Sequence, residues 1–334
     1  MSTNTRNAAS GLSYCGLIFL VLCLAVTALF VVRQIPLTSD DDFYLEYFSE
    51  FRDFGDTLIL AIVDEPLFKV VTNLLYRVLT PEINVRVLIC LTILPHIFVA
   101  YRLSGWRSWA YIGGYFLFVE LAPHLSWVQL RQGFAVGLLC LIFHFTRERY
   151  RVLSVFVVGL IHTSMLVLLP CFALASIRRK VVAYGLILAA AFALFALPDI
   201  VGLVGLAFGR RESVYLNEAP TYPIIYVLYC VLIAVYVTLF ARDRVNSDRL
   251  LAYHAMCALV LPMFFMTTFG AFAERLFFVV RWYELTIVTQ STRAGAGRVA
   301  VGYVAMNFSY SVYHSIVNYG SGGVLDRYLQ LISP

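Results

Sequence analysis

Apolar runs of about 20 residues recur along the whole chain, separated only by short polar links, and such a run is what an α-helix needs to cross a bilayer. Hydrophobic residues make up 61% and charged residues 13% of the chain. A soluble domain usually carries about 25% charged residues. The sequence therefore predicts an all-α, polytopic integral membrane protein. We expect one transmembrane domain over residues 1–334, because no polar stretch is long enough for a separate soluble domain.

Short clusters of Lys and Arg at the ends of the apolar runs predict the topology, because positive charges gather on the cytoplasmic side. These positions are Arg6, Arg102, Arg107, Arg147, Arg149, Arg151, Arg178, Arg179, Lys180, Arg242, Arg244, Arg249, Arg293 and Arg298. The net charge of +5 is therefore explained by membrane topology, and we expect no nucleic-acid partner. We expect the N-terminus in the cytoplasm and the first apolar run to be a true span, since it is too long for a signal peptide. The predicted spans lie near residues 12–33, 84–102, 107–122, 128–146, 181–206, 221–241, 250–269, 274–291 and 298–317.

Residues 152–177 offer room for one span but have basic clusters at both ends, which a single crossing would not allow. Two short helices that meet near His162, Thr163 and Ser164 satisfy the charge pattern. Irregular backbone at membrane depth is tolerated where protein or a water-filled cavity covers it. We therefore predict a broken-helix hairpin with His162 at its tip, which brings the total to about 11 spans.

An acidic segment at about residues 34–84 is predicted to lie on the outer side of the membrane. Ten acidic residues fall between Asp40 and Glu82. Within it, residues 66–79 place apolar side chains at helical spacing, with Lys69, Asn73 and Arg77 on the opposite face. This spacing predicts an amphipathic helix at the membrane interface, with Pro66 in its first turn.

Charged residues and a histidine stranded among the apolar runs are candidates for function. They are Asp40, Asp41, Asp42, Glu65, Arg131, His162, Arg210, Arg211, Glu274 and Arg275. The predicted topology puts nearly all of them on the outer side, where together they would form one polar site. The cysteines have no CxxC spacing and the histidines are scattered, so we expect neither a disulfide framework nor a metal site, and no cofactor.

The acidic candidates have two readings each. The run of residues 40–42 is either a solvated turn that caps the next helix, or a source of a carboxylate that accepts a proton from a hydroxyl. In the second reading, Tyr44 and Tyr47 serve as stacking faces. Glu65 precedes Pro66, so capping of the next helix is the ordinary reading. Its place in the same outer segment as the aspartates favours a functional role.

The basic candidates are judged in the same way. Arg131 and Gln132 open an otherwise apolar helix, where the arginine either reaches the interface or grips a diphosphate with its planar fork. His162 is either a hydrogen-bonded core histidine or part of the polar site. Arg210 and Arg211 are two adjacent cations in an outer loop, paired with nearby acids or bound to an anion. Glu274 and Arg275 either pair with each other or add a second cation to the diphosphate site.

Four short motifs occur in the order that they have in the EpsG-like branch of Wzy-type polysaccharide polymerases. They are Asp41 to Tyr44 as Asp-x-x-Tyr, Glu65-Pro66 before Leu67-Phe68, residues 130–135 as Leu-Arg-Gln-Gly-Phe-Ala, and residues 161–164 as Ile-His-Thr-Ser. The chain resembles this family over its first half, and its second half matches through general outline and the late Glu274-Arg275. The family usually has an Arg close to a Gly-Thr-Asp, whereas Arg33 here lies seven residues before Asp40, which leaves Asp40 and Asp41 both open for the family position.

The resemblance implies a membrane glycosyltransferase with a GT-C-like architecture in the bacterial inner membrane. We expect it to be metal-independent, because diphosphate is a good leaving group and arginines can bind its charge. Such an enzyme polymerises undecaprenyl-diphosphate-linked oligosaccharide repeats at the periplasmic face. Donor and acceptor are then both lipid-linked oligosaccharides, with membrane lipid and a chain-length regulator as further partners. Asp40, Asp41, Glu65 and His162 are the expected catalytic residues.

The other expected roles divide between the leaving group and the sugar. Arg131, Arg210, Arg211 and Arg275 are expected to bind the diphosphate, and Asp42, Tyr44, Gln132 and Glu274 to contact the substrate. Two other functions stay open at this point. A flippase or transporter of a lipid-linked saccharide would line a passage with such charges, but the chain shows no internal repeat. A membrane acyltransferase that modifies glycans would use His162 as its base.

Overall fold

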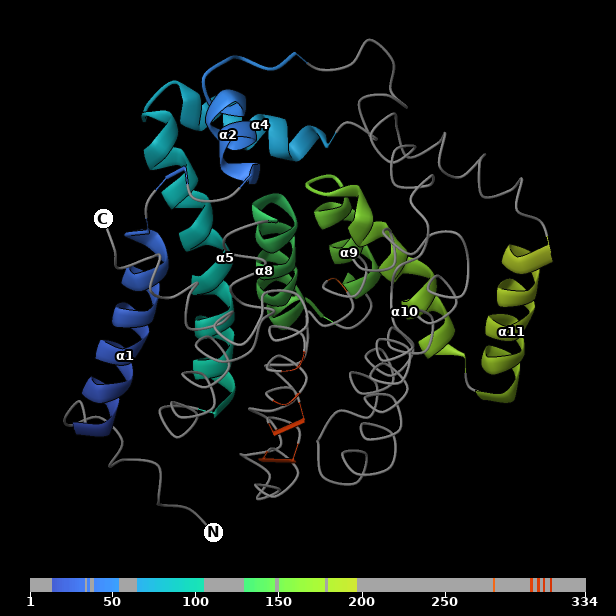
Figure 1. Ribbon diagram of the computed structural model, residues 1–334. Helices are drawn as coiled ribbons and strands as arrows, with labels where there is room; N and C mark the ends of the chain where they lie inside the picture. Colours follow the sequence, from blue (N-terminus) through green and yellow to red (C-terminus); the bar gives the residue numbers. More distant parts are fainter. Residues whose placement is uncertain are drawn as a thin grey trace.

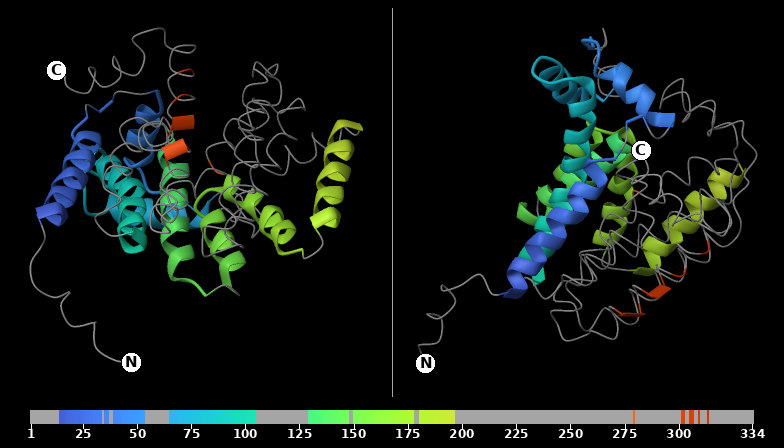
Figure 2. Two further views of the ribbon diagram at one scale, coloured as in Figure 1. Left: turned by 90° about the horizontal axis from the view of Figure 1, so that it is seen from below. Right: turned by 60° about the vertical axis from the view of Figure 1, so that its left-hand side comes forward.

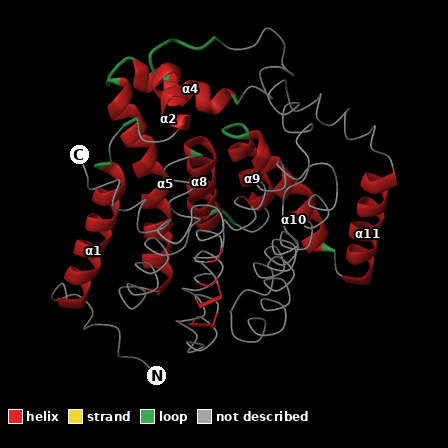
Figure 3. Cartoon of the chain, in the orientation of Figure 1, coloured by secondary structure: helices red, strands yellow, loops and turns green. Residues whose placement is uncertain are grey.

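The computed structural model describes residues 14–33, 35, 36, 39–53, 65–104, 129–147, 150–177 and 180–196, with a few single positions between residues 279 and 313. Its helices are α1 (Tyr14–Val31), α2 (Ser39–Tyr47), α4 (Pro66–Tyr76), α5 (Pro81–Ser104), α8 (Leu130–Phe145), α9 (Arg151–Gly159), η4 (Thr163–Val167), α10 (Leu168–Ser176) and α11 (Lys180–Ala196). Within these residues there is no strand, as Figure 3 shows, which confirms the all-α class.

The long helices agree with the spans that the sequence predicts. Helices α1, α5 and α8 lie on the ranges 12–33, 84–102 and 128–146, and α11 begins the range at 181. By length and composition, Pro81–Val99 in α5 is the one helix among the described residues that is long and apolar enough to cross a membrane, and Leu130–Phe145 is a shorter apolar helix. The total of about 11 spans stays a prediction, because the ranges 107–122, 221–241, 250–269, 274–291 and 298–317 lie outside the continuous described segments.

Helix α5 is the centre of the described bundle. It packs against α8 on one side and α1 on the other, and α8 continues the contacts to α9 (Figures 1 and 2). Helices α2 and α4 pack against α5 where α5 begins, and α4 lies across that end of the bundle in Figure 1. The start of α8 and the end of α9 lie at this same end, which we call the α4 end.

The close packing of α5 on α8 depends on Gly137. A Cβ atom at this position would lie 2.8 Å from the backbone oxygen of Thr92 and 3.1 Å from that of Leu91. Small residues let membrane helices approach in this way, because dispersion contacts rather than hydrophobic burial hold them together. Neither oxygen belongs to a flexible side chain, so the two helices would have to separate to make room.

Gly137→Ala is therefore expected to lower the free energy of unfolding by about 1–3 kcal/mol, the usual range for overpacking. The measurement is thermal unfolding of the purified protein in detergent. Gly185→Ala is the matched control, because a Cβ atom at Gly185 in α11 would meet nothing within 4 Å. Alanine favours a helix interior over glycine, so the control is expected to match or exceed the wild type. Equal stability of the two variants would contradict the tight α5–α8 contact.

The hairpin predicted from the charge pattern is confirmed. Helices α9 and α10 pack against each other on either side of a turn and the short helix η4, and His162 lies in the turn. Gly159 allows the return of the chain, since a Cβ atom there would overlap the Leu166 side chain.

Helix α4 forms where predicted, but Lys69 and Asn73 of its polar face point inward rather than to water, while Arg77 is exposed. Lys69 and Asn73 are 8% and 7% exposed, whereas Leu74 is 61% exposed. Asn73 accepts a hydrogen bond from the Arg52 amide and donates one to the Arg52 carbonyl, both at 2.9 Å, and Lys69 donates to the Asp53 carbonyl at 2.8 Å. The reason is that residues 51–53 are not helical, so their backbone groups need partners, which α4 supplies.

The end of α1 is held by two arginines. Arg86 on α5 donates hydrogen bonds to the carbonyl oxygens of Val31 and Arg33, the second at 3.2 Å. These are carbonyls at the C-terminal end of a helix, which lack partners within the helix and favour a cation. Arg33 in turn pairs with Asp41 on α2 through two bonds of 2.6 Å. Together these contacts fix α2 above the start of α5.

Candidate active site

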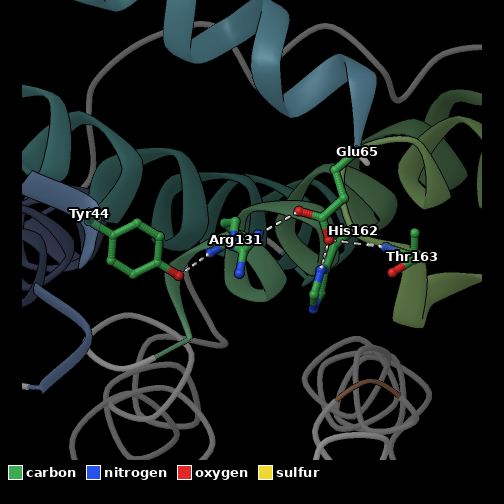
Figure 4. A network of polar contacts seen from close by, with 5 residues as sticks. All are labelled: Tyr44, Glu65, Arg131, His162 and Thr163. Atoms are coloured by element: carbon green, nitrogen blue, oxygen red, sulfur yellow. Dashed lines mark hydrogen bonds and ion pairs between the residues drawn. The ribbon is translucent and has the colours of Figure 1, made fainter. Parts of the chain in front are cut away.

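Glu65 is the centre of a polar cluster at the α4 end (Figure 4). Its Oε2 accepts a hydrogen bond from Nη1 of Arg131 at 2.8 Å. Its Oε1 is bonded to Nδ1 of His162 and accepts a longer bond from the Thr163 amide at 3.4 Å. Arg131 and His162 thus meet on the carboxylate of Glu65, although they lie 66 and 97 positions after it in the sequence.

The backbone at Glu65 has the left-handed conformation, with φ 56° and ψ 60°. A residue other than glycine adopts it at a cost of about 1–3 kcal/mol, and only where the surroundings enforce it. Here the first turn of α4 is anchored to the hairpin, since the Leu67 amide donates to the Leu160 carbonyl at 3.0 Å. The alternative reading of Glu65 as a helix cap finds no hydrogen bond in support, since its side chain makes no cap hydrogen bond to α4.

Arg131 is placed by the first turn of α8. Its backbone amide donates to the Tyr44 hydroxyl oxygen at 3.1 Å, which satisfies one of the amides that a helix start leaves without a partner. Its guanidinium lies 5.2 Å from the ring centroid of Phe43 and 5.9 Å from that of Phe68. These rings hold the cation over their faces, where the ring quadrupole attracts it.

His162 is placed by the turn between α9 and η4. Its backbone is extended, its amide donates to the Val158 carbonyl, and its own carbonyl accepts from the Met165 amide, both bonds being 3.0 Å long. The turn is therefore tied to helical segments on both sides. Its side chain is 14% exposed, against 25% for Arg131.

Two arginine–carboxylate pairs at the α4 end differ in their hydrogen bonds and in the exposure of their side chains. Arg33 and Asp41 form a two-pronged pair, and both side chains are 0% exposed. Arg131 gives Glu65 a single Nη1 bond and keeps a quarter of its side chain exposed. The guanidinium fork binds carboxylate or phosphate through two parallel bonds. The second pair is thus the one whose arginine side chain is partly exposed.

Glu65 is held in its ionised form by the groups that contact its carboxylate. Burial alone would raise the pKa of Glu65. The charges of His162 and Arg131 and the hydrogen bonds from His162 and the Thr163 amide outweigh burial, and they lower the pKa to about 2. At neutral pH this carboxylate is therefore an acceptor of hydrogen bonds and not a proton donor.

This lowered pKa predicts a pH window for stability. A carboxyl group whose pKa is lower in the folded state stabilises the fold above its ordinary pKa of 4.5, and the effect is lost as the pH falls through about 2. We expect the difference in unfolding temperature between the wild type and Glu65→Gln to stay constant from neutral pH to about 5 and to shrink below that. A difference that shrinks already between pH 7 and 5 would show that the group is not held ionised.

The other predicted site residues have different places. Tyr44 is 3% exposed and contacts Arg131 through its hydroxyl group, so its ring is not an open stacking face. Gln132 is 2% exposed next to Arg131, and Asp42 is exposed on α2. The Asp40 side chain, Arg210, Arg211, Glu274 and Arg275 lie outside the described part of the structure. In that part, no three His, Cys, Asp or Glu side chains lie close enough to hold a metal ion.

Three contributors to the site were given no site role in the sequence analysis, although Phe68 and Thr163 belong to the motifs. Phe43 and Phe68 border the guanidinium, and the Thr163 amide supports the carboxylate. The sequence indicates the two aromatic residues only weakly, because each lies within three residues of an acidic candidate. The sequence gives no indication of the Thr163 amide, since every residue other than proline carries a backbone amide.

The comparison with known proteins identifies the family of the chain. A model of the EpsG family matches residues 16–326. The chain belongs to the EpsG family. No curated protein and no solved structure matches it. Membership in the EpsG family, with the apolar helix in α5, indicates a membrane protein of polysaccharide biosynthesis with a polymerase-type function.

The EpsG match covers nearly the whole chain, which extends the resemblance from the first-half motifs to the second half. Glu65, Arg131 and His162 come from three of those motifs, and they share one hydrogen-bonded cluster. Tyr44 and Phe68 belong to the same motifs and border Arg131. In this EpsG family member, motifs that are scattered in sequence thus converge on one place.

Proposed function

We propose that this protein is a glycosyltransferase that polymerises lipid-linked oligosaccharide repeats carried on undecaprenyl diphosphate. The observation that carries the proposal is the carboxylate of Glu65, which joins a partly exposed arginine to a histidine in a member of the EpsG family. A polymerase of this kind needs a base for the acceptor hydroxyl and a cation for the departing diphosphate. The cluster supplies both side by side.

In the proposed reaction, Nε2 of His162 takes the proton of an acceptor hydroxyl at the non-reducing end of one lipid-linked repeat. The hydroxyl oxygen attacks the anomeric carbon of the growing glycan on a second lipid. The bond between that carbon and the diphosphate oxygen breaks, and its electron pair leaves with undecaprenyl diphosphate. Arg131 binds the negative charge that develops there, and the proton on His162 passes to water afterwards.

The proposed orientation is the one expected from the predicted topology, in which the short basic clusters at the ends of the spans mark the cytoplasmic side. Arg102 near the end of α5, Arg147 after α8, Arg151 at the start of α9 and Lys180 at the start of α11 lie away from the α4 end. Positive charge favours the cytoplasmic side, so the α4 end is proposed to face the periplasm from a multi-pass protein in the inner membrane, with the N-terminus in the cytoplasm. Arg210, Arg211 and Arg275 are proposed as further diphosphate ligands, and Glu274, Asp42 and Gln132 as sugar contacts.

The proposed roles of the aspartates differ. Asp41 is given the structural task of holding Arg33, because the pair is closed and fully buried. Asp40 remains a candidate for acceptor contact at the start of α2. A chain-length regulator remains a proposed partner of the whole protein.

The test uses purified wild-type protein in detergent or liposomes with a synthetic oligosaccharide repeat on undecaprenyl diphosphate. We expect longer lipid-linked glycans and free undecaprenyl diphosphate, in equal amounts per bond formed, both with and without EDTA. No lengthening would overturn the polymerase proposal, and loss with EDTA would overturn metal independence. Movement of the intact repeat across the liposome membrane would favour a flippase instead, and transfer from an acyl donor would favour an acyltransferase.

A further inference from the structure

The two oxygens of Glu65 serve different partners, and this division limits the hydrogen bonding of His162. Oε2 receives Arg131, while Oε1 receives Nδ1 of His162 and the Thr163 amide. An ionised carboxylate has no hydrogen to donate. The contact at Nδ1 therefore requires the hydrogen to be on the ring nitrogen.

A neutral imidazole carries one hydrogen. With Nδ1 protonated, the lone pair is at Nε2, and Figure 4 shows that the far edge of the His162 ring points away from Glu65. The arrangement is the one in which a carboxylate orients a histidine base by binding its other nitrogen. The ring then has its accepting nitrogen on the side away from the protein groups that hold it.

The backbone around Glu65 also holds its carboxylate in this position. Glu65 keeps a strained left-handed backbone, and its side chain does not cap the helix that it precedes. The Leu67–Leu160 hydrogen bond ties its position to the same hairpin that carries His162. Carboxylate and imidazole are thus held relative to each other by the backbone as well as by their mutual bond.

We propose that Glu65 is a positioning residue that fixes the tautomer of His162, with Nδ1 protonated and Nε2 free to accept the hydroxyl proton. This inference rests on the proposed function, in which His162 is the base. In this role both oxygens of Glu65 bind protein donors, so its contribution to the reaction passes through Arg131 and His162. Arg131 and His162 are then held by one anion, and the described residues that hold the His162 ring contact it at Nδ1.

Glu65→Gln tests this assignment because an amide has one accepting oxygen and one donating nitrogen. Arg131 has only donors, so the amide oxygen must turn to Arg131 and the amide nitrogen to His162. Nδ1 must then accept a hydrogen bond, which moves the ring hydrogen to Nε2. The substitution keeps size and shape but reverses the tautomer.

The experiment uses full-length protein with histidine labelled with ¹⁵N at the δ1 position only, at a pH well above the ordinary histidine pKa. His162→Gln identifies the signal of His162 among the six histidines. We expect a protonated δ1 nitrogen in the wild type and an unprotonated one in Glu65→Gln. Polymerisation by Glu65→Gln is expected to lose about 10⁴-fold in kcat, the effect of a wrong tautomer in serine proteases. Its KM for the lipid-diphosphate donor is expected to change little, because Arg131 keeps its partner.

Several outcomes separate the inference from simpler roles. An unchanged tautomer, or a kcat close to that of the wild type, overturns it, and a rise in KM alone would make Glu65 a ligand of the substrate. If Glu65→Gln does not fold, Glu65→Asp and Glu65→Asn form a second matched pair. Asp is expected to keep the wild-type tautomer and Asn to reverse it. Wild-type protein that shows the expected tautomer but forms no polymer would refute the proposed function and leave the role of Glu65 intact.

Discussion

Arg131→Ala is expected to lower polymer formation by about 10²–10³-fold or more, as does the loss of one preorganised donor at a site of developing charge. The single lipid-linked repeat supplied in the assay should remain unextended. The physical reason is that the departing diphosphate would lose the cation that Glu65, Phe43 and Phe68 hold in place. The measurement is the length distribution of lipid-linked glycan from purified protein.

Two further variants give this prediction its controls. Arg131→Lys is expected to recover only part of the activity, because a lysine has the charge but not the planar fork. Arg77→Ala removes an exposed arginine just beyond α4, whose guanidinium lies 6.0 Å from the Phe51 ring centroid. It is expected to keep activity within about twofold, as surface substitutions usually do. Equal losses in Arg77→Ala and Arg131→Ala would show that general positive charge, and not a specific site, supports the reaction.

Asp41→Asn is expected to destabilise the folded protein by about 3–5 kcal/mol, because it leaves the buried Arg33 charge without its carboxylate. Both side chains are 0% exposed, so water cannot take over the role of the missing anion. The loss should appear as a lower unfolding temperature in detergent and a smaller yield of folded protein. The substitution should also disturb the active site, because α2 contains Tyr44 and Phe43, which contact Arg131.

A paired substitution separates the structural role of Asp41 from a catalytic one. Arg33→Met combined with Asp41→Leu removes both charges, and replacement of a buried ion pair by apolar residues is often neutral or stabilising. The double variant is therefore expected to be more stable than Asp41→Asn and to regain activity. An Asp41→Asn protein that folds like the wild type but forms no polymer would restore the catalytic reading of this aspartate.

The sequence alone was sufficient for the class of fold and for the list of candidates. Helices α1, α5 and α8 follow from apolar runs and basic ends, and the break at His162 follows from basic clusters on both sides of residues 152–177. These are local properties, because hydropathy and charge act on each segment directly. The same reasoning picked out Glu65 and Arg131 as charges that an apolar chain would not retain without a use.

Tertiary structure decided which candidates meet. Nothing in the spacing of Glu65, Arg131 and His162 shows that one carboxylate binds both other side chains, since the contacts span 66 and 97 positions. Asp41 looked equivalent to its neighbours until Arg33 was found against it, and part of the polar face of α4 turned inward to satisfy the backbone of residues 51–53. Composition determines that polar groups in such a chain need partners. Only packing determines which partners they find, because a hydrogen bond requires a defined distance and direction between groups that lie far apart in the sequence.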